Sequence, residues 1–291
     1  MSAARSTGLL YATLGAFGFA FKAIFIKAAY TWGVDAETLL ALRMGYALPF
    51  FIVMGLVVAR RTPMQLSARD WWALLVLGFL GYYAASYLDF LGLRYISAAL
   101  ERLILFLYPT MVLLMSALFL GKPLSRKLIW PLLLCYGGIV LAIGHDIQVG
   151  GSSVMIGGAL VFASSLCYAA YLMLSGELIA RLGAMRVTAY ATSVACTLSL
   201  LQFVLMRPLS SLVQPWQVHA LGAAMAIFST VLPIWLVAEA MRRIGAGPAS
   251  MVGTLGPVLT ILLAALVLGE PLGFLQICGA ALVIFGVSRI R

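Results

Sequence analysis

The sequence predicts an all-α polytopic membrane protein with ten transmembrane helices, built as a 5+5 inverted-topology repeat. Three observations predict it: an apolar composition, ten long apolar runs, and a residue pattern that recurs after 148 positions. Of the 291 residues, 64% are hydrophobic and 10% are charged, and the mean hydropathy is +1.08. Soluble domains carry about 45–50% apolar and about 25% charged residues, so a water-soluble globule is excluded.

Apolar runs bounded by charge, glycine or proline define the ten spans, and each is long enough to cross a bilayer. The short loops between them leave no room for a soluble catalytic domain. The runs lack the alternating polar pattern of β-barrel strands. The predicted spans are 7–29, 36–59, 70–92, 97–120, 127–145, 153–176, 187–206, 218–240, 246–268 and 272–289.

The distribution of Lys and Arg predicts the orientation. With the N-terminus in the cytoplasm, 13 basic residues fall in cytoplasmic segments, whereas only Arg94 and Arg207 fall in the opposite loops. Because cytoplasmic loops are enriched in Lys and Arg, we expect both termini to be cytoplasmic. The net charge of +10 comes from residues scattered in ones to threes, so it does not indicate a nucleic-acid-binding surface.

The two halves of the chain align at the constant offset of 148. Residues 120–124 read Leu-Gly-Lys-Pro-Leu and residues 268–272 read Leu-Gly-Glu-Pro-Leu, within a stretch of ten identical pairs that include Pro109 and Pro257. Each half, 1–148 and 149–291, contains five spans. Because five is odd, the second half must enter the membrane from the opposite side. Inverted repeats are typical of secondary transporters, whose sites lie near the midplane between the halves.

These features resemble the drug/metabolite transporter superfamily, EamA type. The resemblance is carried by the ten spans, the inverted repeat, the Leu42-Arg43 pair and the two Leu-Gly-[Lys/Glu]-Pro-Leu endings. Within that superfamily, the length and the aromatic-rich spans are similar to bacterial exporters of aromatic amino acids. The resemblance implies a bacterial inner (plasma) membrane protein that exports its substrate. It also implies a central cavity lined by spans one, three, four, six, eight and nine.

Two basic residues lie deep in predicted spans, where an ionised side chain is costly and normally has a partner or a function. Lys22 lies about 22 Å along span one. Two interpretations fit it: it binds a carboxylate of the substrate, or it forms a structural ion pair with Asp89 or Glu101. For Arg43 in span two, we expect a structural ion pair.

Asp89, Glu101 and Arg102 lie near the outer ends of spans three and four. With Arg94 between them, they predict an ion-pair cluster that forms either an extracellular gate or a plain interfacial network. No acidic residue lies near the middle of a span. We therefore expect transport down the substrate gradient, without obligatory proton exchange.

Aromatic residues near the middle of spans are candidates for contacts with flat aromatic or cationic ligands, since phenol and indole rings stack on such groups. Helix packing is the alternative for each of them. The predicted substrate-binding residues are Lys22, Tyr83, Tyr87, Tyr108, Tyr168, Tyr171 and Trp235.

Spans four and nine carry a matched pair of prolines, Pro109 and Pro257, and each removes a backbone hydrogen bond. Gly253 and Gly256 precede Pro257. Interrupted helices at matching positions of two halves indicate a site or a hinge.

No nucleotide-binding, zinc-protease or nucleophile-elbow motif occurs in the sequence. We therefore expect neither an enzyme nor a bound cofactor or metal.

The prediction is a secondary transporter that exports small amphiphilic metabolites, with aromatic amino acids as the specific expectation. The alternatives are a multidrug or cationic-compound exporter of the same fold, and an intramembrane lipid-modifying enzyme. The partners are a small-molecule substrate and the bilayer. Since one chain contains both halves, a monomer is sufficient for transport, and an oligomer is also possible.

Overall fold

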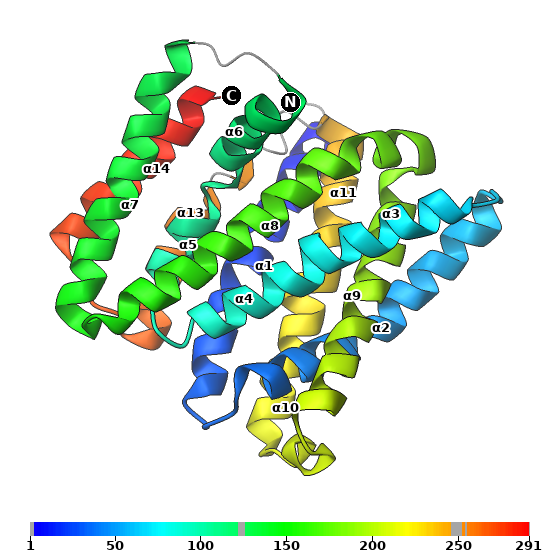
Figure 1. Ribbon diagram of the computed structural model, residues 1–291, viewed down its shortest axis with the longest axis horizontal. Coiled ribbons are helices and arrows are strands. Elements are labelled where there is room, and N and C mark those ends of the chain that lie inside the picture. The colour runs from blue at the N-terminus through cyan, green and yellow to red at the C-terminus, as the bar shows by residue number, and fades with distance from the viewer. Residues whose placement is uncertain (1–2, 122–125, 246–251, 254, 291) are drawn as a thin grey trace.

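The computed structural model describes residues 3–121, 126–245, 252–253 and 255–290, and within them every regular element is a helix (Figure 1). Eight helical segments are long and apolar enough to cross a membrane, and two shorter apolar helices, Leu255–Leu268 and Phe274–Arg289, follow them. The predicted fold class is therefore confirmed: the protein is an all-helical membrane protein with ten helical segments.

The first half contains five of these segments. They are α1 (Ala3–Tyr30), α2 (Ala36–Arg61), the continuous run α3–η1–α4 (Ala68–Gly78, Phe79–Ala84, Ala85–Gly92), the pair α5 and α6 (Ala98–Leu105, Tyr108–Leu120), and η2 with α7 (Arg126–Leu128, Ile129–Gly150). Asp35 and Ser97 cap α2 and α5, because their side chains accept hydrogen bonds from the backbone of Thr38 and Leu100.

The second half repeats this order. It contains α8 (Ser153–Leu182), α9 (Ala184–Met206) with the short η3 (Leu209–Leu212), the run α10–η4–α11 (Trp216–Ala226, Ile227–Val231, Leu232–Ile244), α13 (Leu255–Leu268) and α14 (Phe274–Ile290). Most predicted span ends agree with the helices within three residues. Four ends differ by more. The first helix α1 begins at Ala3 instead of 7, and α7 continues to Gly150 instead of 145. The helix α8 continues to Leu182 instead of 176, and α11 to Ile244 instead of 240. The predicted start of span nine at 246 lies outside the described residues.

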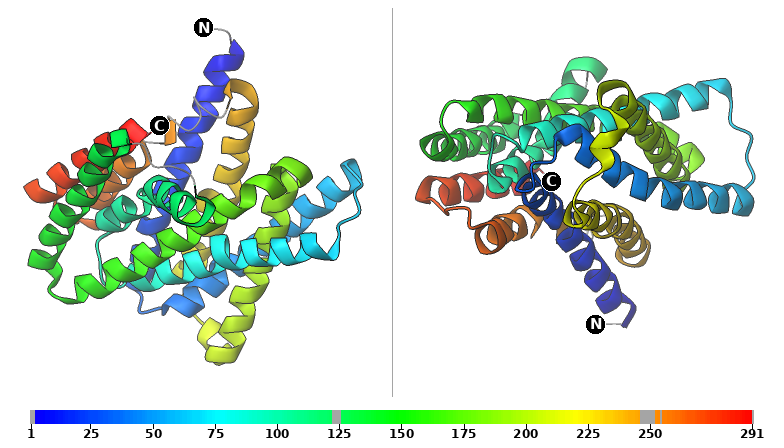
Figure 2. Two further views of the ribbon diagram at one scale, coloured as in Figure 1. Left: turned by 45° about the horizontal axis from the view of Figure 1, so that its top comes forward. Right: turned by 90° about the horizontal axis from the view of Figure 1, so that it is seen from below.

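Helix packing has the symmetry that an internal repeat requires. Equivalent helices pack directly on each other in two cases, α2 with α9 and α7 with α14 (Figure 1). The contact of α1 with α11 has its counterpart in α8 with α4, and that of α1 with α13 has its counterpart in α8 with α6. In both views of Figure 2, the N-terminal part of α1 projects past the other helices beside α11.

Two further features recur at the offset of 148. The π-helical turns η1 and η4 begin at Phe79 and Ile227, and each interrupts the middle of a span. Leu118 and Leu266 are 77% and 83% exposed, so both equivalent helices present leucine to the surrounding lipid. π-helical turns inside α-helices often mark functional positions. Together with the packing, these matches support two structurally equivalent halves.

Span four is interrupted next to Pro109. The helix stops at Leu105 and resumes at Tyr108, because Pro109 has no N–H to donate to the carbonyl of Leu105. That carbonyl instead accepts a hydrogen bond from Ser165 Oγ of α8, at 3.4 Å. The kink therefore joins span four to the second half of the molecule.

Candidate functional site

A cavity of about 460 Å³ lies between the two halves, within the size range of small-molecule sites. Its wall comes from α1, α2, η1, α4, α5, α6, α8, η4 and α11, together with Gly253. On α1 it extends from Lys22 back to Ala12, about 15 Å along the helix. Its charged or hydroxyl-bearing lining residues are Lys22, Arg43, Tyr82, Ser86, Asp89, Arg102, Tyr108, Ser164, Ser165, Tyr168, Ser229 and Thr230.

Lys22 forms a cluster with two carboxylates at one end of this cavity. Its Nζ lies 2.6 Å from Asp89 Oδ2 and 3.0 Å from Glu101 Oε1. Asp89 is 2% exposed and Glu101 is fully buried. The sequence predicted one of these pairs as an alternative, and the structure has both. The ammonium of Lys22 therefore already has anionic partners when no ligand is present.

These contacts correct one prediction. The side chains of Asp89 and Glu101 reach the depth of Lys22, so the cavity does contain carboxylates, although both residues lie near helix ends in the sequence. The expected absence of a mid-span carboxylate was therefore wrong. Arg94, which was expected to belong to the same cluster, is exposed.

Arg43 differs from Lys22 in its partners. Its Nε donates to Thr230 Oγ1 at 3.1 Å, and its guanidinium lies over the Phe90 ring at 5.5 Å from the centroid. The expected ion pair is wrong: within the described ranges, no carboxylate lies within 4.0 Å of Arg43. Its Nη1 is buried and has no hydrogen-bond partner there.

Arg102 lies between the cavity and the predicted hinge. It lines the cavity and its Nε is buried without a hydrogen-bond partner among the residues described. Its guanidinium lies against Gly256, where an added Cβ would come within 2.7 Å of Arg102 Nη2. Close approach of the charged group therefore depends on glycine at this position. Gly253 lines the cavity, and Pro257 is buried in the first turn of α13.

Phenols and hydroxyls of α8 form a second wall of the cavity. The Tyr168 ring lies 5.4 Å from that of Tyr108 and 5.7 Å from that of Tyr171. The hydroxyl groups of Tyr171 and Tyr82 are 3.2 Å apart. Ser164 Oγ donates to the Ala85 carbonyl at 2.6 Å, so α8 is fixed against α4. The three rings of Tyr82, Tyr108 and Tyr168 face the same space.

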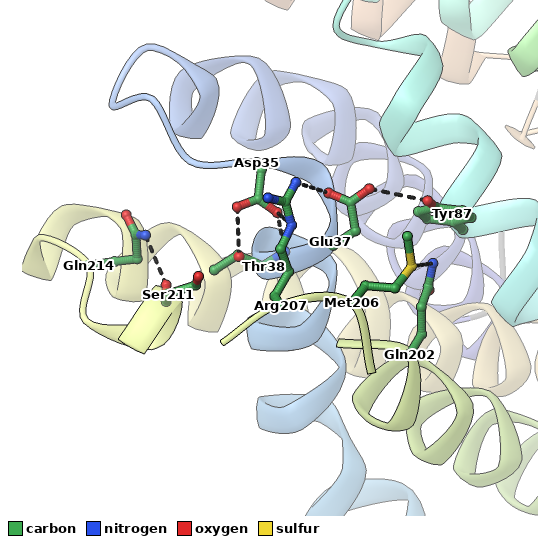
Figure 3. A network of polar contacts seen from close by, with 9 residues as sticks. All are labelled: Asp35, Glu37, Thr38, Tyr87, Gln202, Met206, Arg207, Ser211 and Gln214. Carbon is green, nitrogen blue, oxygen red and sulfur yellow. Dashed lines mark hydrogen bonds and ion pairs between the residues drawn. The ribbon is translucent and has the colours of Figure 1, made fainter. Parts of the chain in front are cut away.

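Outside the cavity, a polar network joins the start of α2 to the end of α9 (Figure 3). Arg207 lies 3.1 Å from Glu37 and 3.4 Å from Asp35, and the Tyr87 hydroxyl donates to Glu37 at 3.1 Å. Partial burial of Asp35 opposes ionisation, but hydrogen bonds from the backbone and hydroxyl of Thr38 outweigh it and lower the pKa of Asp35. The carboxyl group of Asp35 is therefore ionised at neutral pH.

The same end of the molecule is closed by a second contact between the halves. Glu270 accepts hydrogen bonds from the backbone N–H groups of Ala98 and Ala99 at the start of α5, at 2.9 and 3.4 Å. A carboxylate at a helix N-terminus satisfies unpaired donors there. The cavity instead extends toward the start of α1 and the end of α11, where Ala12 and Met241 line it.

The structure separates the predicted substrate-binding residues into two groups. Lys22, Tyr108 and Tyr168 line the cavity, and Tyr171 supports Tyr168 and Tyr82 from behind. Three others lie outside the lining. Tyr83 stacks on Tyr87, whose hydroxyl belongs to the polar network of Arg207, and Trp235 is 48% exposed beside Tyr11.

Sequence reasoning missed several lining residues. Tyr82 directly precedes the predicted residue Tyr83, and only the direction of its side chain distinguishes it. The small hydroxyl residues carry no signal, because serine and threonine in an apolar helix commonly bond to their own backbone. The missed residues are Tyr82, Ser86, Ser164, Ser165, Ser229 and Thr230.

Comparisons with known proteins agree with this architecture. The EamA-like transporter family model matches the chain twice, over residues 6–144 and 155–290. The chain is 32% identical to the uncharacterized transporter YcbK of Bacillus subtilis, over 98% of this chain and 93% of YcbK. It is 27% identical to the uncharacterized transporter YyaM of the same organism, over 96% and 92%. A crystal structure of a protein superposes with a TM-score of 0.63 at 20% identity, over 98% and 96% of the two chains.

Proposed function

Because the chain belongs to the EamA-like transporter family, we propose that its central cavity binds small amphiphilic metabolites and exports them, with aromatic amino acids as the first expectation. The protein is a multi-pass membrane transporter, and its relatives are bacterial transporters rather than enzymes. One observation carries the substrate proposal: phenol rings and charged groups face one cavity between the two halves.

The cavity fits a ligand with an apolar flat part and a polar end. Tyr82, Tyr108 and Tyr168 supply aromatic surface, and ring pairs of this kind prefer stacked or edge-to-face contact. The charged residues Lys22, Arg43, Asp89 and Arg102 lie on other parts of the wall. We no longer assign Tyr83, Tyr87 and Trp235 to the ligand, because they lie outside the lining.

We propose alternating access between the halves as the mechanism. The outer ends are joined by Arg207 with Glu37 and by Glu270 with the start of α5, whereas the cavity extends toward the opposite ends of α1 and α11. With the N-terminus in the cytoplasm, this arrangement is inward-facing. Pro109, Gly253, Gly256 and Pro257 are the proposed hinge, and Asp89, Glu101 and Arg102 the proposed gate.

The orientation itself is tested by labelling. A cysteine placed at Trp32, an exposed residue beyond the end of α1, should react with an impermeant thiol reagent in intact cells. A cysteine at Arg61, at the other end of α2, should react only after the membrane is opened. The reverse pattern would contradict cytoplasmic termini and an inner-membrane exporter.

Energy coupling follows from the charges of the cluster. Both Asp89 and Glu101 pair with Lys22, and Arg102 adds a second basic side chain, so the formal charges of the four residues sum to zero. We therefore keep the proposal of export down the substrate gradient without obligatory proton exchange. Accumulation against a gradient that collapses with a protonophore would contradict it and assign proton transfer to Asp89 or Glu101.

Transport of labelled L-phenylalanine by the purified protein in liposomes tests the proposed substrate class. We expect saturable exchange that unlabelled L-tryptophan inhibits and L-alanine does not. A second candidate, export of cationic compounds, rests on the buried carboxylates of Asp89 and Glu101. Ethidium transport without L-phenylalanine transport would favour that candidate.

A further inference from the structure

Arg43 is a buried cation with no carboxylate within 4.0 Å among the described residues. Its exposed fraction is 7%, and it lines the central cavity from α2. Among the described residues, its one hydrogen bond to a side chain goes to Thr230, and Nη1 has no partner. A buried cation that lacks a paired carboxylate is unfavourable, so an anionic ligand at this position would stabilise it.

A second unpartnered polar atom lies in the neighbouring residue of η4. Ser229 Oγ is buried, lines the same cavity and has no hydrogen-bond partner in the described part of the chain. The adjacent Thr230 accepts from Arg43 Nε and donates to the Met225 carbonyl, which fixes the guanidinium against the π-helical turn. A guanidinium N–H and a hydroxyl on one wall are donors suited to a carboxylate.

The charges of the cavity favour one negative group. Since Lys22 and Arg102 balance Asp89 and Glu101, Arg43 leaves the site with a formal charge of +1. A monocarboxylate neutralises that charge, whereas a phosphate dianion exceeds it. Lys22 is less suited to the carboxylate because two anionic oxygens already lie within 3.0 Å of it.

We propose that Arg43 and Ser229 form the subsite that binds the carboxylate of the transported substrate, while the tyrosines contact its apolar part. This inference rests on the proposed function of the cavity. It assigns the substrate class as monocarboxylates with a flat apolar group, and it assigns to Lys22 a structural pairing.

The test compares an acid with its amide. 3-Phenylpropionate and 3-phenylpropanamide have the same shape and differ in charge, so binding of both to the purified protein isolates the carboxylate contribution. We expect the wild type to prefer the acid by about 10- to 100-fold, the effect of a hydrogen bond to a charged group. Arg43→Gln should abolish the preference, because it should weaken binding of the acid much more than binding of the amide. Arg60→Gln, an exposed residue of the same helix, should retain it.

Thermal unfolding without ligand distinguishes binding from a structural role. Because none of the described carboxylates lies within 4.0 Å of Arg43, Arg43→Gln should unfold at a temperature no lower than the wild type. A clear decrease would overturn the proposal. A second variant, Ser229→Ala, keeps the cation and should reduce acid affinity several-fold; an unchanged affinity would remove Ser229 from the subsite.

The outcomes separate the inference from the proposed function. Equal binding of acid and amide by the wild type, or an acid preference that survives Arg43→Gln, would overturn the carboxylate subsite and leave the aromatic cavity standing. If neither probe binds and L-phenylalanine is not transported, the proposed function fails, and the inference fails with it.

Discussion

The two halves share a fold but contribute different chemistry to the cavity between them. The first half supplies five charged side chains in or beside the cavity, and their equivalents at the offset of 148 are uncharged. Lys22, Arg43, Asp89, Glu101 and Arg102 correspond to Ala170, Ala191, Val237, Ala249 and Ser250. The second half supplies hydroxyls instead, from Ser164, Ser165, Ser229 and Thr230, in addition to Tyr168.

This difference indicates which features serve the fold and which serve the site. The prolines, the π-helical turns and the lipid-facing leucines recur in both halves, so the shared architecture requires them. The charges occur once, and the equivalent alanines and valine show that the architecture does not need them. We infer that the charged end of the substrate is bound mainly by the first half, whereas tyrosines of both halves contact its apolar part.

The largest expected effect on stability follows from removing the ammonium group of Lys22, which pairs with Asp89 and Glu101. Lys22→Ala leaves the buried carboxylates of Asp89 and Glu101 facing each other without a counter-charge. We expect the free energy of unfolding to fall by about 3–5 kcal/mol, as for other broken buried pairs. Thermal unfolding in detergent measures it.

The same position provides its own control. The triple variant Lys22→Ala, Asp89→Asn, Glu101→Gln makes the first half resemble the uncharged second half, and it should recover a large part of the lost stability. Lys22→Ala that unfolds like the wild type but transports poorly would contradict the structural pairing. That result would instead support the interpretation that Lys22 binds the substrate.

A smaller effect is expected on the aromatic wall of the second half. Tyr168→Ala removes a ring that lies against Tyr108 and Tyr171, and it should reduce exchange of L-phenylalanine about tenfold. Tyr168→Phe keeps the ring and should change exchange little. Tyr190→Ala, whose ring stacks on Trp71 outside the cavity, is the matched control. Equal losses in the Tyr168→Ala and Tyr190→Ala variants would contradict a specific aromatic wall.

The contact between Arg102 of the first half and Gly256 of the second should matter for rate more than for stability. In Gly256→Ala the new methyl would come within 2.7 Å of Arg102 Nη2, so the guanidinium must move. We expect exchange to slow several-fold, with an unfolding temperature close to that of the wild type. Gly144→Ala on α7 has no atom within 4 Å of the new methyl and should exchange normally. A normal rate in Gly256→Ala would remove this contact from the gate and hinge.

The smallest effect is expected at the outer network. Arg207 is partly exposed, and exposed ion pairs contribute little to stability, so Arg207→Gln should lower the unfolding temperature only slightly. The substitution should instead change the access of reagents to the cavity from outside the cell. If the network holds the outer ends together, its loss should increase labelling of a cysteine at Ser86 from outside the cell. Unchanged labelling would show that the network does not close the cavity.

The membrane fold was predictable from the sequence, since apolar runs and Lys and Arg counts reflect bilayer thickness and topology. Features that depend on contacts between distant segments were not predictable from these sequence patterns. The run of α8 continues past Glu177 and Arg181, because Arg181 pairs with Asp70 of the other half, and no local pattern indicates that partner. The π-helical turns leave the apolar pattern unbroken, so they were not predicted.

The candidate site was only partly predictable, for a related reason. A lysine deep in a span is energetically costly, so the sequence indicated that Lys22 has a partner or a function. Asp89 and Glu101 were the acidic residues nearest to its depth. The same reasoning failed for Arg43, because it assumed that every buried cation has a protein partner. Which serines and tyrosines face the cavity depends on helix rotation, and that is set by packing between the halves.

The central claim is that charges of the first half and the wall of the second half form one substrate site. Val237 tests it, because it lines the cavity on α11 and is the second-half equivalent of Asp89. In a variant with its four cysteines replaced and Val237→Cys introduced, L-phenylalanine should slow alkylation of that thiol. The added substitution Arg43→Gln should abolish the protection. Alkylation that L-phenylalanine leaves unchanged with Arg43 in place would contradict a substrate site shared by the two halves.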